Sequence, residues 1–211
     1  MLASINAVLT SRITKAIVFS ACLVPGAVLL WRYTHHELGA NWIEAAQRFT
    51  GDWILRFLIL TLCVTPIRRL PGLSALIRYR RMLGLFAFAY ACVHVSIYLK
   101  FDKAFDWLEI RDDILMRKFY IWGLVAFVCL MPLALTSTAG WIRRLGGRRW
   151  RMLHRLIYVS ALSGALHYYL QGKYIVMRAV VYAAIVVVLV AYRPVAFVWM
   201  KRRRGRVAVR Q

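Results

Sequence analysis

Acidic residues are scarce in this sequence. Its 211 residues contain 8 Asp and Glu against 30 Lys and Arg, which gives a formal net charge of +22. No paired catalytic acid and base, no nucleophile beside an orienting base and no G-x-G-x-x-G motif is recognisable, which argues against chemistry on an organic substrate within the chain.

The four cysteines lack C-x-x-C spacing, so neither a zinc site nor a thiol redox motif is indicated. They are interpreted as small buried apolar residues: Cys22, Cys63, Cys92 and Cys129.

Hydrophobic residues are abundant and fall in long blocks. They make up 62% of the chain, and the mean hydropathy is +0.60. A bilayer core of about 30 Å needs about 20 helical residues to cross it. The sequence therefore predicts an all-α integral membrane protein, a six-transmembrane-helix bundle that forms one domain over residues 1–211. The expected spans cover approximately residues 15–33, 53–67, 82–100, 119–137, 152–170 and 174–192.

The positive charges alternate along the chain. Basic residues precede the first span, fill the second and fourth connections and form the tail, whereas the first and third connections carry the acidic residues. Lys and Arg in short loops resist translocation, so this alternation predicts that the N and C termini are both cytoplasmic. Binding of anionic lipid head groups would explain the amount of charge but not its alternation, and nucleic-acid binding is not indicated. The basic residues concerned are Arg12, Lys15, Arg68, Arg69, Arg78, Arg80, Arg81, Arg143, Arg144, Arg148, Arg149, Arg151, Lys201, Arg202, Arg203, Arg204, Arg206 and Arg210.

Two segments near the N-terminus need their own interpretation. The first span is followed by no small-residue cleavage site, since Leu29, Leu30, Trp31 and Arg32 come after its apolar run, so we expect it to stay attached. Residues 38–51 contain apolar positions at helical spacing behind Asn41, a suitable N-cap. This segment predicts a short helix that lies on the outer membrane surface.

Three histidines lie on two of the expected spans. His94 lies about 18 Å along the third span from its inner end, and His167 lies at a similar depth on the fifth. Two neutral imidazoles at one depth on neighbouring helices are the geometry of a six-coordinate b-type haem. A single buried histidine could instead form a hydrogen bond between helices. The matched depth and the presence of His154 favour haem.

The inner part of the same two spans is harder to assign. Thirteen residues at about 100° each place His154 and His167 about 140° apart around one helix, so either the helix is distorted or the two histidines serve different sites. About fourteen residues before His94 the third span has Arg80 and Arg81 in place of a histidine. Arginine cannot ligate iron, but it can bind a phosphate, such as that of flavin mononucleotide (FMN), a haem propionate or a quinone oxygen. The same arginines also serve as topology signals.

Four segments together resemble a known family. They are LGANWIEAAQRFTG, RRMLGLFAFAYACVHVSIYL, LALTSTAGWIRRLGG and WRMLHRLIYVSALSGALHYYL. They are similar to the MsrQ family, the haem-binding membrane subunit of the bacterial periplasmic protein-methionine-sulfoxide reductase system. That family resembles a reduced form of the ferric-reductase-like transmembrane domain, in which the third and fifth spans each carry two histidines for two stacked haems.

The resemblance implies an electron-transfer subunit in the bacterial inner membrane. Electrons from the quinone pool or a cytosolic flavin reductase would pass through haem b to a periplasmic molybdopterin-containing subunit that repairs oxidised methionines. His94, His154 and His167 fall on the family's haem-linked histidines; His94 and His167 would be the axial iron ligands and His154 an inner ligand. Arg80 and Arg81 fall on its arginine pair, where FMN or a quinone would bind. The third span lacks the inner histidine, which puts a second haem in doubt.

The residues leave other functions open. After Tyr192 only a short arginine-rich tail remains, too little for an FAD and nicotinamide domain, so we expect electrons to arrive from another protein or from quinone. A stand-alone transmembrane ferric or quinone reductase would share all the internal chemistry and differ only in its acceptor. A proton-coupled transporter would use the histidines as a proton relay, but no span centre carries an acidic residue.

Overall fold

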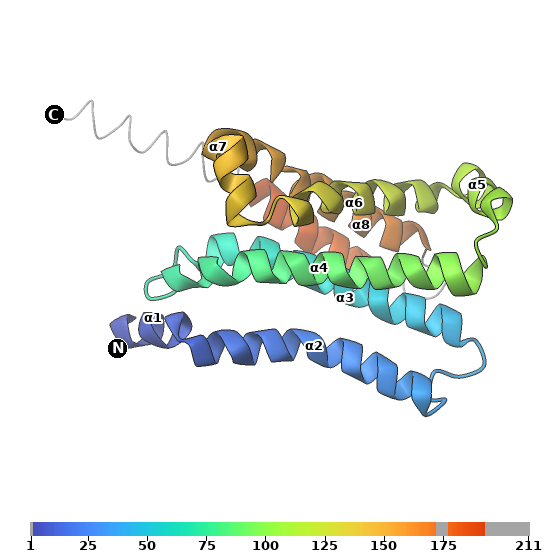
Figure 1. Ribbon diagram of the computed structural model, residues 1–211, viewed down its shortest axis with the longest axis horizontal. Coiled ribbons are helices and arrows are strands. Elements are labelled where there is room, and N and C mark those ends of the chain that lie inside the picture. The colour runs from blue at the N-terminus through green and yellow to red at the C-terminus, as the bar shows by residue number, and fades with distance from the viewer. Residues whose placement is uncertain (1, 172–176, 193–211) are drawn as a thin grey trace.

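Long helices lie side by side with nearly parallel axes (Figure 1). The computed structural model describes residues 2–171 and 177–192, and within these residues it contains helices and no strand. In chain order the elements are α1 (Leu2–Thr10), α2 (Arg12–Thr34), α3 (Trp42–Ile67), the 3₁₀ helix η1 (Ser74–Leu76), α4 (Ile77–Ile97), the π-helix η2 (Tyr98–Asp102), α5 (Trp107–Met116), α6 (Lys118–Leu135), α7 (Ala139–Leu153) and α8 (Leu156–Gln171). A further apolar helix covers Met177–Tyr192.

Four helical stretches are long and apolar enough to cross a membrane. They are α2, α3, α6 and the continuous stretch Ser74–Asp102, which contains α4. They correspond to the first four expected spans, so the chain is a multi-pass membrane protein. The fifth and sixth expected spans correspond to the shorter helices α8 and Met177–Tyr192, and the six-span count stays a prediction. The first residues of the sixth span and the basic tail after Tyr192 lie outside the described residues.

The expectation of a separate surface helix at residues 38–51 is wrong. Residues from Trp42 onward form the first turns of α3, which continues without a break to Ile67. Asn41 is the N-cap, as expected: its side chain accepts a hydrogen bond from Glu44 N at 3.2 Å and donates one to the Glu44 carboxylate at 3.0 Å. Gly51 lowers helix propensity by only about 1 kcal/mol, which is too little to end a helix that packs along most of its length.

Two helix pairs form the centre of the bundle. The most extensive contacts join α3 to α4 and α6 to α8. Between α6 and α8 the backbones approach closely, because small residues face each other: Ser160 Oγ donates to the Ala126 carbonyl at 2.9 Å. The buried core between the pairs is apolar and includes Phe57, Leu58, Leu62, Ala87, Ala91, Leu130, Ala161 and Ala165.

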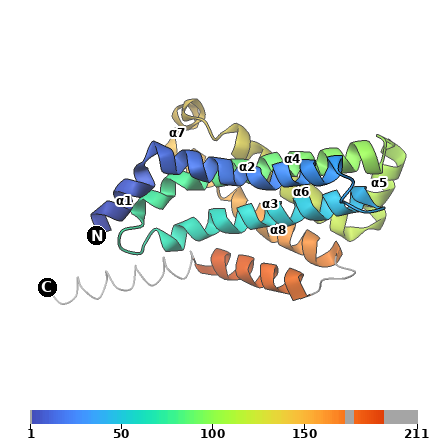
Figure 2. The same cartoon turned by 90° about the horizontal axis from the view of Figure 1, so that it is seen from below.

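The outer two helices are held by a few polar contacts. Tyr90 on α4 inserts its hydroxyl into the hydrogen-bond ladder of α2: it accepts from Gly26 N at 2.7 Å and donates to the Cys22 carbonyl at 3.0 Å. The helix Met177–Tyr192 lies beside α8 (Figure 2), and its Tyr182 accepts a hydrogen bond from Arg56 Nε on α3 at 3.0 Å.

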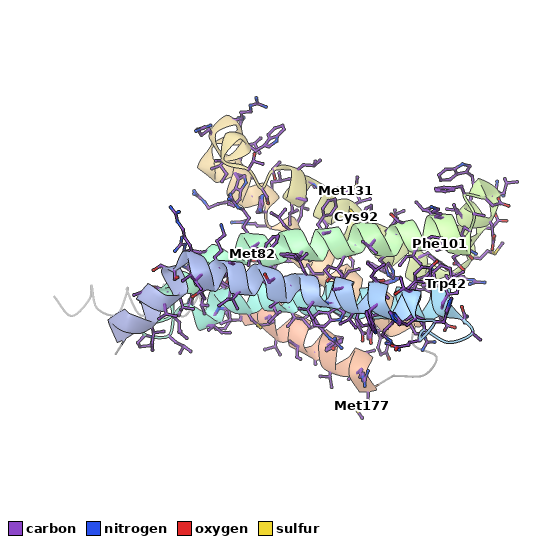
Figure 3. All side chains as sticks on the ribbon, turned by 60° about the horizontal axis from the view of Figure 1, so that its bottom comes forward. Trp42, Met82, Cys92, Phe101, Met131 and Met177 are labelled. Carbon is purple, nitrogen blue, oxygen red and sulfur yellow. The ribbon has the colours of Figure 1, made fainter. Side chains whose placement is uncertain are left out.

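The connections divide between the two ends of the bundle. The α3–α4 connection, α1 and α7 lie at one end, and α5 and the α2–α3 connection lie at the other (Figure 1). The arginine-rich connections therefore share one end. The opposite end carries an aromatic contact between Trp42 and Phe101, whose ring centroids are 5.1 Å apart (Figure 3). Aromatic residues are enriched at membrane interfaces, so this contact is consistent with a membrane boundary there.

Candidate functional site

His94 and His167 lie together at the end of the bundle opposite the arginine-rich connections. His94 comes from α4 and His167 from α8, and their ring centroids are 6.3 Å apart with the ring planes at 89°. When each of two imidazoles binds a shared metal through one nitrogen at about 2 Å, as metal–imidazole bonds do, their ring centres are on the order of 6 Å apart. The structure thus brings together the two residues predicted as axial ligands at a spacing that suits one metal ion between them.

The hydrogen bonds of the two rings leave the same nitrogen available in each. His94 Nδ1 lies 2.9 Å from Thr50 Oγ1 on α3, and His167 Nδ1 lies 2.7 Å from the Phe119 carbonyl on α6. A carbonyl oxygen only accepts, so His167 carries its proton on Nδ1 and its lone pair on Nε2. Metal-ligating histidines commonly donate their second ring N–H in this way, which orients the ring and raises its basicity.

A glycine on α6 gives His167 its space. A Cβ at Gly123 would lie 2.8 Å from His167 Nδ1 and 3.0 Å from Cε1. Because real Cβ atoms do not approach ring atoms this closely, any other residue at this position would displace the imidazole. Gly123 therefore allows His167 to lie against the backbone of α6 and to reach the Phe119 carbonyl.

The two imidazoles line a cavity of about 80 Å³ between α3, α4, α6 and α8. It is smaller than the roughly 300 Å³ at which pockets for compact organic ligands begin, so a porphyrin fits only if the lining side chains move outward. Gln47 also lines the cavity, and its Nε2 is buried without a hydrogen-bond partner among the described residues. A carboxylate at the edge of a bound porphyrin would accept a hydrogen bond from this nitrogen.

The donor set favours haem over a bare metal ion. In the described part of the chain no group of three or more His, Cys, Asp and Glu side chains could hold a metal ion. Two imidazoles complete the coordination of a metal that brings four ligands of its own, as haem iron does. A haem fits the available Nε2 atoms, the ring spacing and the unpartnered Gln47 amide. The small cavity would have to widen to hold it.

A second and larger cavity lies at the arginine-rich end. Its volume is about 850 Å³, and it is lined by residues of α3, α4, α6, α7 and α8. Both predicted arginines and His154 line it, together with Arg151 and Arg155, which the sequence analysis did not assign to this site. Neither Arg80 nor Arg81 forms an ion pair within residues 2–171 and 177–192. So many guanidinium groups without acidic partners suit an anionic group such as a phosphate.

His154 is not part of the helix that carries His167. It is the C-cap of α7, and α8 begins at Leu156 after a turn. The 140° angle calculated for one continuous helix therefore does not apply, and the two histidines serve opposite ends of the bundle. His154 Nε2 lies 3.1 Å from Thr136 Oγ1, and the ring stacks on Trp150 with centroids 3.9 Å apart. Thr136 donates to the Pro132 carbonyl at 2.6 Å, so its oxygen accepts from His154.

The sequence singles out the histidines and the arginine pair as candidates, but it does not indicate the residues that contact them. Thr50, Gln47 and Gly123 lie on helices that carry no predicted ligand, and nothing in their spacing relates them to His94 or His167. Trp150 could have been found, because it precedes His154 by four residues and such residues face each other on a helix. Arg151 and Arg155 flank His154 but were interpreted only as topology signals or not assigned.

Comparisons with known proteins show the family of this chain. Residues 50–165 match the model of the family described as "Ferric reductase like transmembrane component". The chain is 48% identical over 194 residues to the "Protein-methionine-sulfoxide reductase heme-binding subunit MsrQ" of Herminiimonas arsenicoxydans, an alignment that covers 90% of this chain and 88% of that protein. It is 46% identical over 198 residues to the protein of the same name from Rhodospirillum rubrum, with 92% of this chain and 93% of that protein covered. A third, from Caulobacter vibrioides, is 42% identical over 195 residues, covering 92% and 91%. By these matches over almost its whole length, the chain belongs to the MsrQ family within the ferric-reductase-like transmembrane proteins.

Proposed function

We propose that this chain is a membrane b-type cytochrome that transfers electrons across the bacterial inner membrane. It is a single domain over residues 1–211 with six spans and with both termini in the cytoplasm. The electrons leave at the periplasmic end for a molybdopterin-containing methionine-sulfoxide reductase subunit, which performs the substrate chemistry. The name of the relatives, a haem-binding subunit of a protein-methionine-sulfoxide reductase, supports this assignment.

The observation that carries the proposal is the pair of imidazoles on α4 and α8. Their centroids are 6.3 Å apart, and each Nδ1 is already hydrogen bonded, so that both Nε2 atoms are available as axial ligands. Haem iron held in this way supplies one-electron transfer with little rearrangement of its ligands. The surrounding residues hold the rings in place: Thr50 and Phe119 accept the Nδ1 protons, and Gly123 provides the space.

The second cavity is proposed to receive the electrons. Arg80, Arg81, Arg151 and Arg155 would bind the phosphate of FMN or the oxygens of a quinone, and His154 would support the same redox site or ligate a second haem. Leu130 lines both cavities, so the two sites are neighbours within the bundle. The donor is the quinone pool or a cytosolic flavin reductase, as the resemblance to the MsrQ family implies.

Absorption spectra of the purified protein test the proposal. We expect reduced-minus-oxidised spectra of a low-spin b-type haem, and loss of that haem in His94→Ala and in His167→Ala. The matched control is His35→Ala, since His35 lies in the α2–α3 connection and its Nδ1 bonds to the Trp31 carbonyl at 3.0 Å, away from both cavities. Unaltered haem content in His94→Ala and His167→Ala would contradict the proposal.

A further inference from the structure

Thr50 on α3 contacts the predicted haem ligand His94 on α4. It lies on α3 with an exposed fraction of 0%. Its hydroxyl oxygen is 2.8 Å from the Ala46 carbonyl, 3.0 Å from the Gln47 carbonyl and 2.9 Å from His94 Nδ1 on α4. One hydroxyl therefore contacts two backbone acceptors and one ring nitrogen, and it has a single proton to donate.

The neighbouring acceptors determine where that proton lies. Both carbonyls of α3 can only accept, so the Thr50 hydroxyl donates to them and presents a lone pair to His94. With its proton on Nδ1, the ring donates to the Thr50 oxygen. With its proton on Nε2, it would place the Nδ1 lone pair against the lone pair of that oxygen, which is unfavourable.

We propose that Thr50 is the positioning residue of the outer haem ligand: its hydroxyl accepts the Nδ1 proton of His94, fixes the tautomer that presents Nε2 to the iron, and adjusts the reduction potential. This inference rests on the proposed haem ligation by His94. The other ligand, His167, donates to a backbone carbonyl at 2.7 Å, which no side-chain substitution removes directly. Thr50 is thus the side chain through which sequence can tune the basicity of an axial ligand.

The test compares Thr50→Val with Thr50→Ser. Valine keeps the shape of threonine without the hydroxyl, whereas serine keeps the acceptor. We expect the haem dissociation constant of Thr50→Val to rise by about 10-fold, the lower end for loss of an outer-shell partner. We also expect its midpoint potential to become more positive, because a less basic imidazole stabilises ferric iron less. Thr50→Ser should return both quantities to those of the native protein.

Thr65→Val is the matched control for the outer haem. Thr65 is also buried on α3, but it lies fifteen residues from Thr50, about 22 Å along the helix, and it lines neither cavity. We expect an unchanged potential and an unchanged low-spin ferric resonance in this variant. If Thr50→Val does not accumulate, Thr50→Cys replaces it with the same expected direction, because a thiol is a weak acceptor.

The outcomes separate this inference from the proposed function. A native protein without haem, or haem retained by His94→Ala, would overturn both. Loss of haem in His94→Ala combined with unaltered affinity and potential in Thr50→Val would overturn the role of Thr50 alone. A shift of equal size in Thr50→Val and Thr50→Ser would also overturn it, since packing and not the hydroxyl would then be responsible.

Discussion

The three histidines differ in the nitrogen that their neighbours leave available. At the outer pair the Nδ1 atoms contact Thr50 and Phe119, so Nε2 is available in both rings. At His154 the contact with Thr136 uses Nε2 instead. An inner ligand role for His154 would therefore use Nδ1 or break the 3.1 Å contact with Thr136. The two ends of the bundle are thus built for different chemistry, which agrees with a haem at one end and an anionic group at the other.

Gly123→Ala tests the close approach of His167 to α6. The added Cβ would lie 2.8 Å from Nδ1, so we expect the ring to move, the bond to Phe119 to weaken and the haem dissociation constant to rise by about 10-fold or more. Overpacking at this position should also lower the free energy of unfolding by about 1–3 kcal/mol. Haem titration of the purified variant measures the first effect.

Gly140→Ala is the control for this prediction. Its added Cβ would meet only Thr138 Oγ1, at 3.8 Å, which is an ordinary contact. We expect haem affinity like that of the native protein. Equal affinities in Gly123→Ala and Gly140→Ala would show that the imidazole does not need the space at residue 123.

At the residue scale, the sequence predicts the relative depth of His94 and His167 but not the residues that contact them. Counting residues along two spans is enough to place His94 and His167 at one depth, because the rise of a helix is constant. Thr50, Gln47 and Gly123 come from other helices. Their positions depend on how α3 and α6 rotate and pack against the ligand helices, and one sequence does not determine that rotation.

At the scale of elements, α2 depends on Tyr90. The Tyr90 hydroxyl bridges Gly26 N and the Cys22 carbonyl, which belong to residues i and i−4 of the helix. An inserted hydroxyl of this kind bends a helix, as does Pro25, which lies between these two residues. Apolar packing also attaches α2, and much of the surface of α2 is exposed for contact with lipid.

Tyr90→Phe should destabilise the attachment of α2. Removal of the hydroxyl leaves a buried donor and acceptor without their partner, so we expect the free energy of unfolding to fall by about 1–3 kcal/mol. Titration with a denaturing detergent measures this change. Tyr33→Phe is the control, because no hydrogen bond of its hydroxyl is found among the described residues; a loss of stability as large as that of Tyr90→Phe would contradict the role of the bridge.

The connection between η2 and α5 is closed by a buried ion pair. Lys103 Nζ lies 2.8 Å from Asp113 Oδ2, and each side chain is 8% exposed. Burial alone would lower the pKa of Lys103, but its bonds to Asp113 and Glu109 outweigh burial and raise this pKa. For Asp113, burial alone would raise the pKa, but the bond from Lys103 outweighs it and lowers this pKa.

These shifts give the pair a defined pH dependence. The contribution of Asp113 is fully present above its unfolded pKa of about 3.9 and is lost as the pH falls through its lower folded pKa. That of Lys103 is fully present below about 10.4 and is lost as the pH rises through its higher folded pKa. We therefore expect Asp113→Asn to be less stable than the native protein by about 3 kcal/mol near neutral pH, the lower end for removing one partner of a buried pair, and this difference to shrink in acid.

Asp112→Asn is the control for the buried pair. Asp112 contacts Arg111 at 2.9 Å, but both side chains are more than half exposed, so the expected loss is below about 1 kcal/mol. Detergent unfolding of both variants at several pH values checks the prediction. A difference for Asp113→Asn that stays constant into acid would contradict the lowered pKa of Asp113.

The helix boundaries show what a hydropathy pattern determines. Apolar runs located the first four spans, because a helix that crosses lipid must be apolar over about 20 residues. The same pattern failed for residues 38–51, since polar residues at the start of α3 look like a surface segment although the hydrogen-bond ladder continues through them. It also failed at His154, where the turn between α7 and α8 lies within an expected span.

Across the whole molecule, charge and cavities follow the same division. The α3–α4 connection and α7, which are rich in arginine, lie at one end of the bundle, and α5 lies at the other (Figure 1). The 850 Å³ cavity is lined by residues from the beginning of α4 and from α7, whereas His94 lies near the end of α4 that leads to α5. The alternation of basic connections in the sequence predicted that these segments would share one end. It did not predict that Arg151 and Arg155 would turn inward beside Arg80, because that depends on how the α7–α8 turn packs over the open end of the bundle.

The double variant Arg80→Gln with Arg81→Gln tests whether the two cavities are separate sites. Glutamine keeps much of the side-chain length but removes the charge that would bind a phosphate, so we expect flavin content to be lost while the outer haem remains. Haem and flavin are counted per chain in the purified protein.

Arg143→Gln with Arg144→Gln is the control. These two arginines lie in α7 at the same end but do not line the cavity, and their substitution removes the same amount of charge. Loss of flavin in both double variants would indicate a general effect of charge. If changing Arg80 and Arg81 removes both haem and flavin, the arginine-rich end and the imidazole pair form one site. A separate anion site could lose its flavin without disturbing the haem ligands, which lie about 20 Å further along α4.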